Sequence, residues 1–425
     1  MNAVIGLLPV VLLAAGVPLY LLLLAASEVA VLSKPAISLS QLHVVFFGGV
    51  DNYVLLAVPF FLFAGEVMGT GGVSRRLVDW MLSALGRTRG GLGLATLGAS
   101  TLFGSISGSS AATVATMGKL MYQPLRDARY GDRFSSAAVT SSGAIDSVIP
   151  PSIPMILFAA VAQQPVGELF LSGVGPALVM CGLTAVYIIW FAGRHEVAAG
   201  EAFSLRRFVR ATRDGFWSLL APVVVLGGIY GGIFAPTEAA AIACAYACLL
   251  SVVLYREMGW RELLECAVRS VRMTSQVMVI VAAAGVFSWV LTISGIGPAL
   301  VSFVRELAPA PWLLLLVINL ILLPVGCILE PGSAILILTP LLMPMIQAAG
   351  IDPVHFGIVV VVNVSVGLFI PPVGMNIFVA QAMLRPHLPS LFRGLMPFLA
   401  IDLVALAVTT YVPPVSVGLA RWLLH

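Results

Sequence analysis

Nine long stretches without a charged residue constrain the fold of this chain more than any other feature of its sequence. Each is long enough, as a helix, to cross about 30 Å of hydrocarbon. A water-soluble core cannot bury so many stretches, because 60% of the 425 residues are hydrophobic and 10% are charged, against about 25% charged in soluble domains. We therefore predict an all-α, polytopic membrane protein with roughly 10 to 12 crossings or re-entrant pieces. The stretches are 1–27, 90–118, 147–167, 169–193, 215–237, 273–304, 307–329, 331–351 and 356–384.

Arginine gathers in the connections between these stretches. Four connections are arginine-rich, which is too many for spans that simply alternate across the membrane with basic loops on one side. Some stretches should therefore be hairpins that return to the same side, or helices that lie flat. Segments 73–85 and 259–272 mix apolar and charged residues as interfacial helices do. Stretch 1–27 is interpreted as the first span, because no convincing cleavage site interrupts it. The sequence leaves the orientation open.

Several functional classes lack support in the sequence. The net charge of +3 is too balanced to indicate a nucleic-acid partner. Motifs for binding ATP, zinc or a dinucleotide are absent from the sequence. The five cysteines show no metal-binding spacing and are interpreted as small packing residues. An intramembrane enzyme would need convergent acids or metal ligands, so we expect no enzymatic activity and no cofactor.

An internal repeat is the most informative pattern. The first half has a Gly/Ser-rich segment at 104–111 and then Pro150-Pro151 inside an apolar run. The second half has a Glu-Pro-Gly-Ser segment at 330–333 and then Pro371-Pro372 inside an apolar run. Segments 104–123 and 329–347 are predicted to be helical hairpins that dip into the membrane and return.

Each Pro-Pro pair should break a helix, because two backbone donors are lost and the ring clashes with the preceding turn. In hydrocarbon such a break must face protein, water or an ion. Freed carbonyl oxygens suit Na⁺, and half-helix N-termini suit a carboxylate. Paired broken helices in two repeats point to a binding site near the membrane midplane.

Two less specific interpretations remain open at this stage. Serines in a membrane helix often only bond back to the preceding turn, and a proline break can be a packing kink. The ionisable residues in apolar surroundings are candidates by default, and Asp146 and Glu330 matter most because they border a break or a hairpin. The others are Glu66, Lys119, Glu238 and Asp402.

At these motifs the chain resembles the large membrane subunit of TRAP (tripartite ATP-independent periplasmic) transporters. The matching segments occur in family order along most of the chain. They are 59–68, 90–93, 103–114, 149–154, 228–240, 337–340, 350–357 and 371–374. The chain departs from the family pattern at Ala144, Asp146 and Ile370, where Thr or Gly is common, and at Glu330, where Asp is common.

The resemblance implies an ion-transporter-like elevator fold with inverted repeats, two re-entrant hairpins and two broken helices. It implies secondary, Na⁺-coupled import of small organic anions such as C4-dicarboxylates, sialic acid or 2-oxo acids. It also implies two partners in the bacterial inner membrane system, a small four-helix membrane subunit and a periplasmic substrate-binding protein. The alternative is a stand-alone Na⁺- or H⁺-coupled organic anion symporter.

The resemblance also implies where the ligands bind. One Na⁺ would lie at Ser105, Ser107, Gly108, Ser109, Gly143, Val148 and Pro150. A second would lie at Glu330, Gly332, Ser333, Gly367, Ile370 and Met375. The organic anion is expected beside them at Ser110, Pro151, Ser152, Pro372, Gly374 and Asn376. Asp146 is a further candidate for ion or proton coupling.

The chain is divided into five parts on these grounds. Residues 1–89 form N-terminal scaffold spans with an interfacial arm, and 193–272 form a central loop, scaffold spans and a second arm. Residues 90–192 and 273–384 form the two transport halves, each a hairpin plus a broken helix, and 385–425 form a C-terminal span. We expect both transport halves to move as one body against the scaffold.

Overall fold

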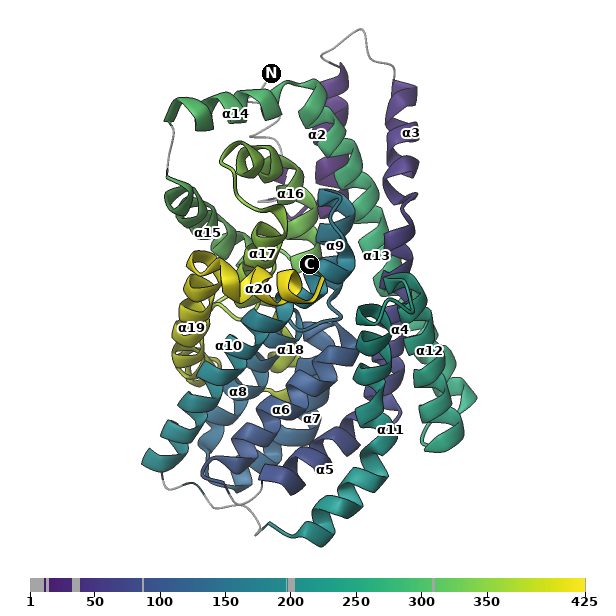
Figure 1. Ribbon diagram of the computed structural model, residues 1–425, viewed down its shortest axis with the longest axis vertical. Coiled ribbons are helices and arrows are strands. Elements are labelled where there is room, and N and C mark those ends of the chain that lie inside the picture. Colours follow the sequence, from purple (N-terminus) through teal and green to yellow (C-terminus); the bar gives the residue numbers. More distant parts are fainter. Residues whose placement is uncertain are drawn as a thin grey trace.

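The computed structural model describes residues 11–12, 15–32, 39–85, 88–195, 197, 203–307 and 310–424, and the regular elements within these ranges are all helical. Helices of different length and tilt pack into one elongated body (Figure 1). The predicted all-α fold with two hairpins and two broken helices is confirmed. The predicted hairpin bounds, 104–123 and 329–347, were wrong, because the first helix of each hairpin lies earlier, at Gly91–Ser107 and at Pro311–Ile328. Segment 329–347 is essentially the single helix Pro331–Ala348.

Two sets of five helices repeat in the same order. The first set is α6 (Gly91–Ser107), α7 (Ser110–Asp127), α8 (Gly131–Asp146), α9 (Ile153–Ala162) and α10 (Val166–Arg194). The second set is α15 (Pro311–Ile328), α16 (Pro331–Ala348), α17 (Pro353–Gly367), α18 (Met375–Leu384) and α19 (Leu388–Tyr411). In each set the first two helices form a hairpin and the next two are one helix broken at Pro-Pro. We call α6–α7 hairpin 1, α15–α16 hairpin 2, residues 147–152 break 1 and residues 368–374 break 2.

The two sets interlock into one body, which we call the block. The returning helix of each hairpin packs on the broken helix of the other set, α7 on α18 and α16 on α9. Helix α19 packs on α8 and α17, and α20 (Pro413–Leu424) packs on α10. The block is therefore α6–α10 together with α15–α20.

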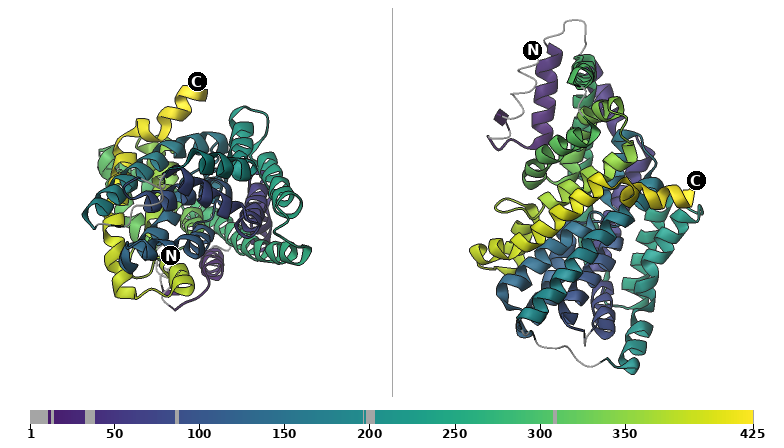
Figure 2. Two further views of the ribbon diagram at one scale, coloured as in Figure 1. Left: turned by 90° about the horizontal axis from the view of Figure 1, so that it is seen from below. Right: turned by 60° about the vertical axis from the view of Figure 1, so that its left-hand side comes forward.

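The remaining helices form a second group, which we call the scaffold. It contains α2 (Leu19–Leu32), α3 (Leu39–Val50), a 3-10 turn (Tyr53–Leu56), α4 (Ala57–Thr70), α11 (Leu205–Tyr230), α12 (Pro236–Cys248), a π turn (Leu249–Leu254) and α13 (Trp260–Ile293). Helix α13 packs along α2, α3 and α4, and Figure 2 shows this long helix beside the block. Two short amphipathic helices, α5 (Val73–Leu85) and α14 (Ile296–Leu307), follow α4 and α13.

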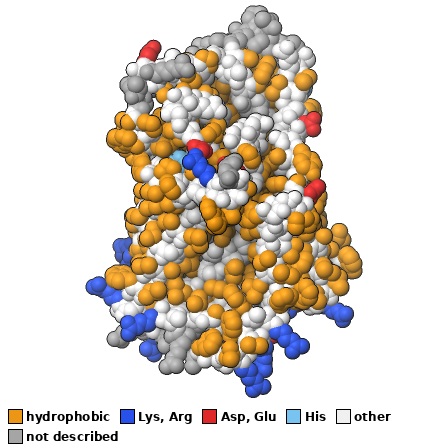
Figure 3. Space-filling view, in the orientation of Figure 1, with side chains coloured by type: hydrophobic (Ala, Val, Ile, Leu, Met, Phe, Trp, Pro, Cys, Tyr) orange, Lys and Arg blue, Asp and Glu red, His pale blue; other side chains and the backbone are white. Residues whose placement is uncertain are grey.

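Seven helices in the described part of the chain are long and apolar enough to cross a membrane. They are Tyr53–Thr70, Val166–Arg194, Pro236–Leu254, Trp260–Ile293, Pro311–Ile328, Pro331–Ala348 and Leu388–Tyr411. Shorter apolar helices, among them both halves of the second broken helix, account for other uncharged stretches. Figure 3 shows apolar side chains over the middle of one face and basic side chains gathered at the end where α5 and the start of α11 lie. Hairpin 1 begins and ends near this basic end (Figure 1), which explains why arginine-rich connections recur so often along the chain.

The structure corrects the predicted second interfacial helix. Segment 259–272 is not a separate element, because α13 runs unbroken from Trp260 to Ile293. No Gly or Pro interrupts the chain between Trp260 and Ala284, so nothing ends the helix there. The predicted division between residues 272 and 273 consequently falls inside one helix. In the first predicted span, helix α2 begins only at Leu19, and residues 1–10 and 13–14 lie outside the described residues.

Two glycines allow α15 and α17 to approach backbone to backbone. A Cβ added at Gly367 would lie 2.7 Å from the Cα of Gly326, and one added at Gly326 would lie 2.8 Å from the Cα of Val364. We expect Gly367→Ala to lower the free energy of unfolding by about 2–3 kcal/mol, because a backbone neighbour cannot move aside as a side chain can. Thermal unfolding of the purified protein in detergent measures this. Gly182→Ala is the matched control, since its Cβ would meet nothing within 4 Å, and equal stability of the two variants would contradict the prediction.

Candidate functional site

A cavity of about 750 Å³ lies between the block and the scaffold. Its block side is formed by the tips of both hairpins and by residues at both breaks. Its scaffold side is formed by the start of α2, by Leu62 of α4 and by one face of α13. The lining residues are Pro18, Leu19, Tyr20, Leu62, Gly108, Ser109, Ser110, Ala111, Ser147, Ile153, Pro154, Met273, Ser275, Gln276, Val277, Val279, Ile280, Glu330, Pro331, Gly332, Ser333 and Met375.

Four helix N-termini converge on this cavity. The first residues of α7, α9, α16 and α18, which are Ser110, Ile153, Pro331 and Met375, all line it. The first amides of a helix lack intrahelical acceptors, and the helix dipole places partial positive charge at the same end. Lysine and arginine are absent from the lining. Backbone amides and dipoles are therefore what this cavity offers to an anion.

The tip of hairpin 1 lies directly on break 1. Gly108 has a left-handed backbone (φ 59°), and its amide donates to the carbonyl of Gly104 at 3.0 Å. A Cβ at Gly108 would lie 3.1 Å from the carbonyl oxygen of Pro151. The Ser109 amide donates to Ser107 Oγ at 3.1 Å. Glycine is thus required by both the turn and the close approach.

Asn376 at the start of α18 ties the two repeats together. Its Oδ1 accepts from Ser110 Oγ at 2.9 Å, and its Nδ2 donates to the carbonyl oxygen of Thr140 at 3.3 Å. Gly143 makes room for this contact, since a Cβ there would lie 2.7 Å from Ser110 Oγ and 2.9 Å from Asn376 Nδ2. The fully buried amide therefore joins hairpin 1, the first broken helix and the second broken helix.

Asp146 is a buried carboxylate beneath hairpin 1. Thr113 Oγ1 donates to its Oδ2 at 2.5 Å, and the Ser107 hydroxyl also faces it. Its Oδ1 has no hydrogen-bond partner, and no ion pair with Asp146 is found in the described part of the chain. Gly104 leaves the space that the carboxylate fills. A buried carboxylate in this position needs a cation or a proton.

Glu330 is exposed to the cavity at the tip of hairpin 2. It is the N-cap residue of α16, and the amides of Gly332 and Ser333 and the Ser333 hydroxyl (3.3 Å) face its carboxylate. One of the four positive helix ends is thus already covered by negative charge. An anion that enters the cavity must therefore come close to a carboxylate.

Both predicted breaks are present, and each is held by local hydrogen bonds. At break 1, Ser152 Oγ donates to the carbonyl of Ser147 at 2.5 Å and accepts from the amide of Met155 at 3.4 Å. At break 2, the amide of Asn376 donates to the carbonyl of Leu368 at 2.9 Å. Both Pro-Pro bonds are cis.

The structure brings some predicted site residues to the cavity and leaves others behind them. Those that line it are Gly108, Ser109, Ser110, Glu330, Gly332, Ser333 and Met375. Those that do not line it are Ser105, Ser107, Gly143, Asp146, Val148, Pro150, Pro151, Ser152, Gly367, Ile370, Pro372, Gly374 and Asn376. Ser105 Oγ bonds back to the carbonyl of Leu102 at 2.7 Å, and the carbonyl oxygen of Val148 lies against α10, 2.7 Å from where a Cβ on Gly173 would be.

The sequence analysis missed the scaffold side of the cavity. Ser275 and Gln276 lie on α13 and line the cavity. The sequence did offer one signal for this side of the cavity, the polar residue Gln276 within the uncharged stretch 273–304. It also missed Thr113, whose hydroxyl holds Asp146.

We expect Asn376→Ala to weaken anion binding about tenfold or more, because it leaves the buried Ser110 hydroxyl at the cavity wall without its partner, a cost of about 1–3 kcal/mol. Binding is measured with the purified protein, and thermal unfolding is recorded in parallel. Asn319→Ala is the matched control, since Asn319 is also buried and donates to Thr410 Oγ1 at 2.9 Å, away from the cavity. If Asn376→Ala lowers stability as Asn319→Ala does but leaves anion affinity unchanged, Asn376 has only a structural role.

Comparisons with known proteins agree with this geometry. Residues 6–415 match the family model described as "Tripartite ATP-independent periplasmic transporter, DctM component". The chain is 40% identical to the C4-dicarboxylate TRAP transporter large permease protein DctM of Pseudomonas aeruginosa, over 91% of this chain and 90% of that protein. It is 36% identical to the isethionate TRAP transporter permease protein DctMQ of Oleidesulfovibrio alaskensis, over 96% of this chain and 64% of that protein. It is 32% identical to the sialic acid TRAP transporter large permease protein SiaM of Vibrio cholerae, over 86% of each.

A solved structure supports the fold. The crystal structure of the Alcanivorax borkumensis YdaH transporter matches with a TM-score of 0.61 at 16% identity, over 90% of this chain and 87% of that chain. The repeat, the cavity and the family match point the same way. The chain belongs to the family of DctM components, the large permease subunits of tripartite ATP-independent periplasmic transporters.

Proposed function

We propose that this permease imports a small carboxylate across the bacterial inner membrane by Na⁺-coupled secondary transport. The observation that carries the proposal is the convergence of four helix N-termini on one cavity between block and scaffold. Such a site holds a carboxylate by amide donors and dipoles and needs no basic side chain. The relatives are named for C4-dicarboxylate, isethionate and sialic acid, and we propose a C4-dicarboxylate as the first substrate to test.

The coupling to a cation follows from the charge at the cavity. An anion cannot bind well beside the Glu330 carboxylate, since like charges in a partly desolvated site repel. A Na⁺ bound at Glu330 removes this repulsion, and oxygen atoms of the hairpin tip suit it. The buried Asp146 carboxylate beneath hairpin 1 also needs a positive charge beside it. We therefore place a second Na⁺ around Ser107 and Asp146. Na⁺ binding then precedes or accompanies anion binding.

The proposed movement is that of the block as one body. Among the described residues, no identified side-chain hydrogen bond or ion pair joins a block helix to a scaffold helix. Examples within one group are Asn319 to Thr410 and Arg421 to Asp352 in the block, and Arg269 to Glu66 in the scaffold. The contact surface between block and scaffold, which we call the seam, can therefore slide without breaking such bonds. This supports an elevator mechanism, in which the block carries the cavity across the membrane.

The family membership supports two partner proteins, and the distribution of arginine supports one orientation of the chain in the membrane. We propose that a periplasmic binding protein delivers the anion and that a small membrane subunit packs on the scaffold. The match to only 64% of the isethionate permease leaves room in that relative for a further part. The arginine-rich end in Figure 3 is placed in the cytoplasm by the positive-inside rule.

The test is uptake of radiolabelled succinate and other carboxylates into proteoliposomes that contain this chain and its small partner. Uptake that requires both an inward Na⁺ gradient and the binding protein supports the proposal. Uptake without the binding protein would favour the stand-alone symporter. Uptake driven by a pH gradient alone would replace Na⁺ by a proton at Glu330 or Asp146.

A further inference from the structure

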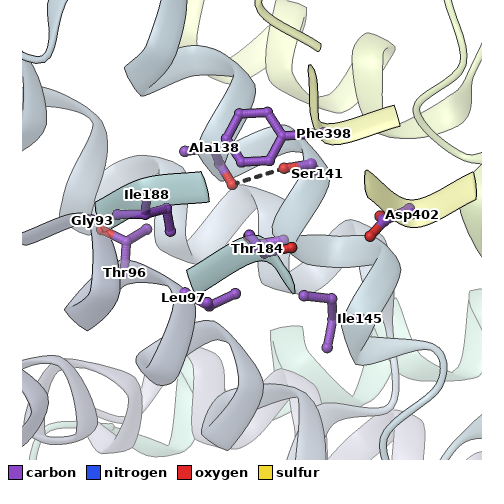
Figure 4. Close-up of a pocket in the computed structure, with 11 residues that line it drawn as sticks. Gly93, Thr96, Leu97, Ala138, Ser141, Ile145, Thr184, Ile188, Phe398 and Asp402 are labelled. Carbon is purple, nitrogen blue, oxygen red and sulfur yellow. Dashed lines mark hydrogen bonds between the residues drawn. The ribbon is translucent and has the colours of Figure 1, made fainter. Parts of the chain in front are cut away.

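A second, much smaller pocket lies inside the block, away from the hairpin cavity. It is enclosed by α6, α8, α10 and α19 and measures about 10 Å³, which is room for one water-sized occupant (Figure 4). It shares no lining residue with the large cavity. Its polar side chains are Thr96, Ser141, Ser142, Thr184 and Asp402.

Asp402 is the only charged side chain in this lining, and no Lys, Arg or His in the lining balances its charge. Its side chain is 2% exposed, and its Oδ1 has no hydrogen-bond partner. No Lys, Arg or His in the described ranges forms an ion pair with it. The titratable group that faces it is the Cys181 thiol on α10, and α6 and α8 present none in the lining. An ionised carboxylate cannot remain in such a site without a cation.

Three of the surrounding hydroxyls already donate their hydrogens to backbone carbonyls. Thr96 Oγ1 donates to the carbonyl of Leu92 at 2.9 Å, and Ser142 Oγ donates to that of Val139 at 2.9 Å. Ser141 Oγ lies 3.4 Å from the carbonyl of Ala138, the bond drawn in Figure 4. A hydroxyl has one hydrogen and two lone pairs, so these hydrogens are already used. The Ser142 oxygen also accepts from Ser100 Oγ at 3.1 Å, which leaves it one lone pair. The polar side chains of the lining present oxygen atoms only, from hydroxyls and one carboxylate.

We propose that this pocket binds one Na⁺, with Asp402 as its charged ligand and the hydroxyls of Ser141, Ser142 and Thr184 as neutral ligands. Oxygen-only lining suits a hard cation. One carboxylate balances a single positive charge, and no cluster of three or more acidic, His or Cys side chains that would hold a divalent ion is found among the described residues. A proton would need only the carboxylate, whereas several acceptor hydroxyls around it favour an ion that takes several oxygen ligands.

This Na⁺ is additional to those proposed at the hairpin tips. All five polar side chains belong to the block, so the ion would travel with the block if the elevator mechanism holds. Binding itself requires neither transport nor the organic anion. Its test can therefore fail or succeed independently of the proposed function.

The experiment measures binding of ²²Na⁺ to the purified full-length chain in lipid nanodiscs, without organic anion or binding protein. We expect Asp402→Asn to bind one Na⁺ fewer than the parent protein. Thr184→Val keeps the carboxylate and should weaken one Na⁺ site about tenfold. Asp127→Asn is the control, because Asp127 lies at the exposed end of α7 and pairs with Gln123. Monodispersity and thermal unfolding confirm that each variant is folded.

Two results would overturn the assignment. One is an unchanged number and affinity of Na⁺ sites in both Asp402→Asn and Thr184→Val. The other is unchanged Na⁺ binding together with a loss of pH dependence in the thermal stability of Asp402→Asn, which would show that the pocket holds only a proton. A loss of one site in Asp402→Asn and a weakened site in Thr184→Val, with Asp127→Asn unchanged, supports it.

Discussion

Replacing Glu330 by Gln is expected to let the organic anion bind without Na⁺ and to weaken one Na⁺ site about 30-fold. Two unit charges about 4 Å apart interact by about 4 kcal/mol at an effective dielectric constant of about 20. The cavity is open to water at Glu330, so we expect about half of that energy, about 2 kcal/mol, which is a factor of about 30. The same carboxylate that repels the anion attracts the cation, so both affinities change when it is neutralised.

The measurement is a pair of binding titrations on the purified protein, ²²Na⁺ binding without anion and succinate binding with and without Na⁺. In the parent protein, succinate should bind much more tightly with Na⁺. In Glu330→Gln that difference should shrink. Glu168→Gln on α10 is the control, since Glu168 does not line the cavity. A variant that keeps its Na⁺ affinity within threefold and still needs Na⁺ for succinate would remove Glu330 from the coupling.

The hairpins and breaks were predictable because their causes are local. A Pro-Pro pair ends a helix whatever surrounds it, and Gly108 permits the left-handed turn that closes hairpin 1. The repeat then identified the second copy of each feature. The residues that shape the hairpin tips and the helix breaks are thus close together in the sequence, and the sequence alone identifies them.

The parts that the sequence did not reveal depend on packing between distant segments. Ser275 and Gln276 line the cavity only because the middle of α13 lies beside the hairpin tips and turns these two residues toward them. Asp402 was visible as an ionisable residue in an apolar stretch, but its pocket is assembled from helices that begin as far back as Gly91. Segment 259–272 was misjudged because an amphipathic pattern shows which face is polar, whereas the end of a helix requires a breaking residue.

Joining the block to the scaffold by a disulfide is expected to abolish transport while sparing Na⁺ binding. Gly69 on α4 and Thr116 on α7 face each other across the seam, since a Cβ at Gly69 would lie 3.5 Å from Thr116 Oγ1. The Thr116 hydroxyl occupies about the position that a cysteine sulfur would take, so the two positions are close enough for a disulfide, whose S–S bond is about 2.0 Å long. A bond of that length cannot stretch while the block slides several ångströms. Gly69→Cys/Thr116→Cys should therefore lose more than about 90% of its uptake on oxidation and regain it on reduction.

The variant is made with Cys181, Cys244, Cys248, Cys266 and Cys327 replaced by Ser or Ala. The matched control restores Cys181 and adds Thr101→Cys instead, because Thr101 Oγ1 and Cys181 Sγ lie 3.3 Å apart within the block. That cross-link joins two helices that move together, so uptake should continue. The side-chain hydrogen bonds and ion pairs identified among the described residues do not join block helices to scaffold helices. The disulfide would therefore be the first strong connection between block and scaffold. Full-rate uptake by a completely cross-linked Gly69–Thr116 protein would show that the block does not slide along this seam.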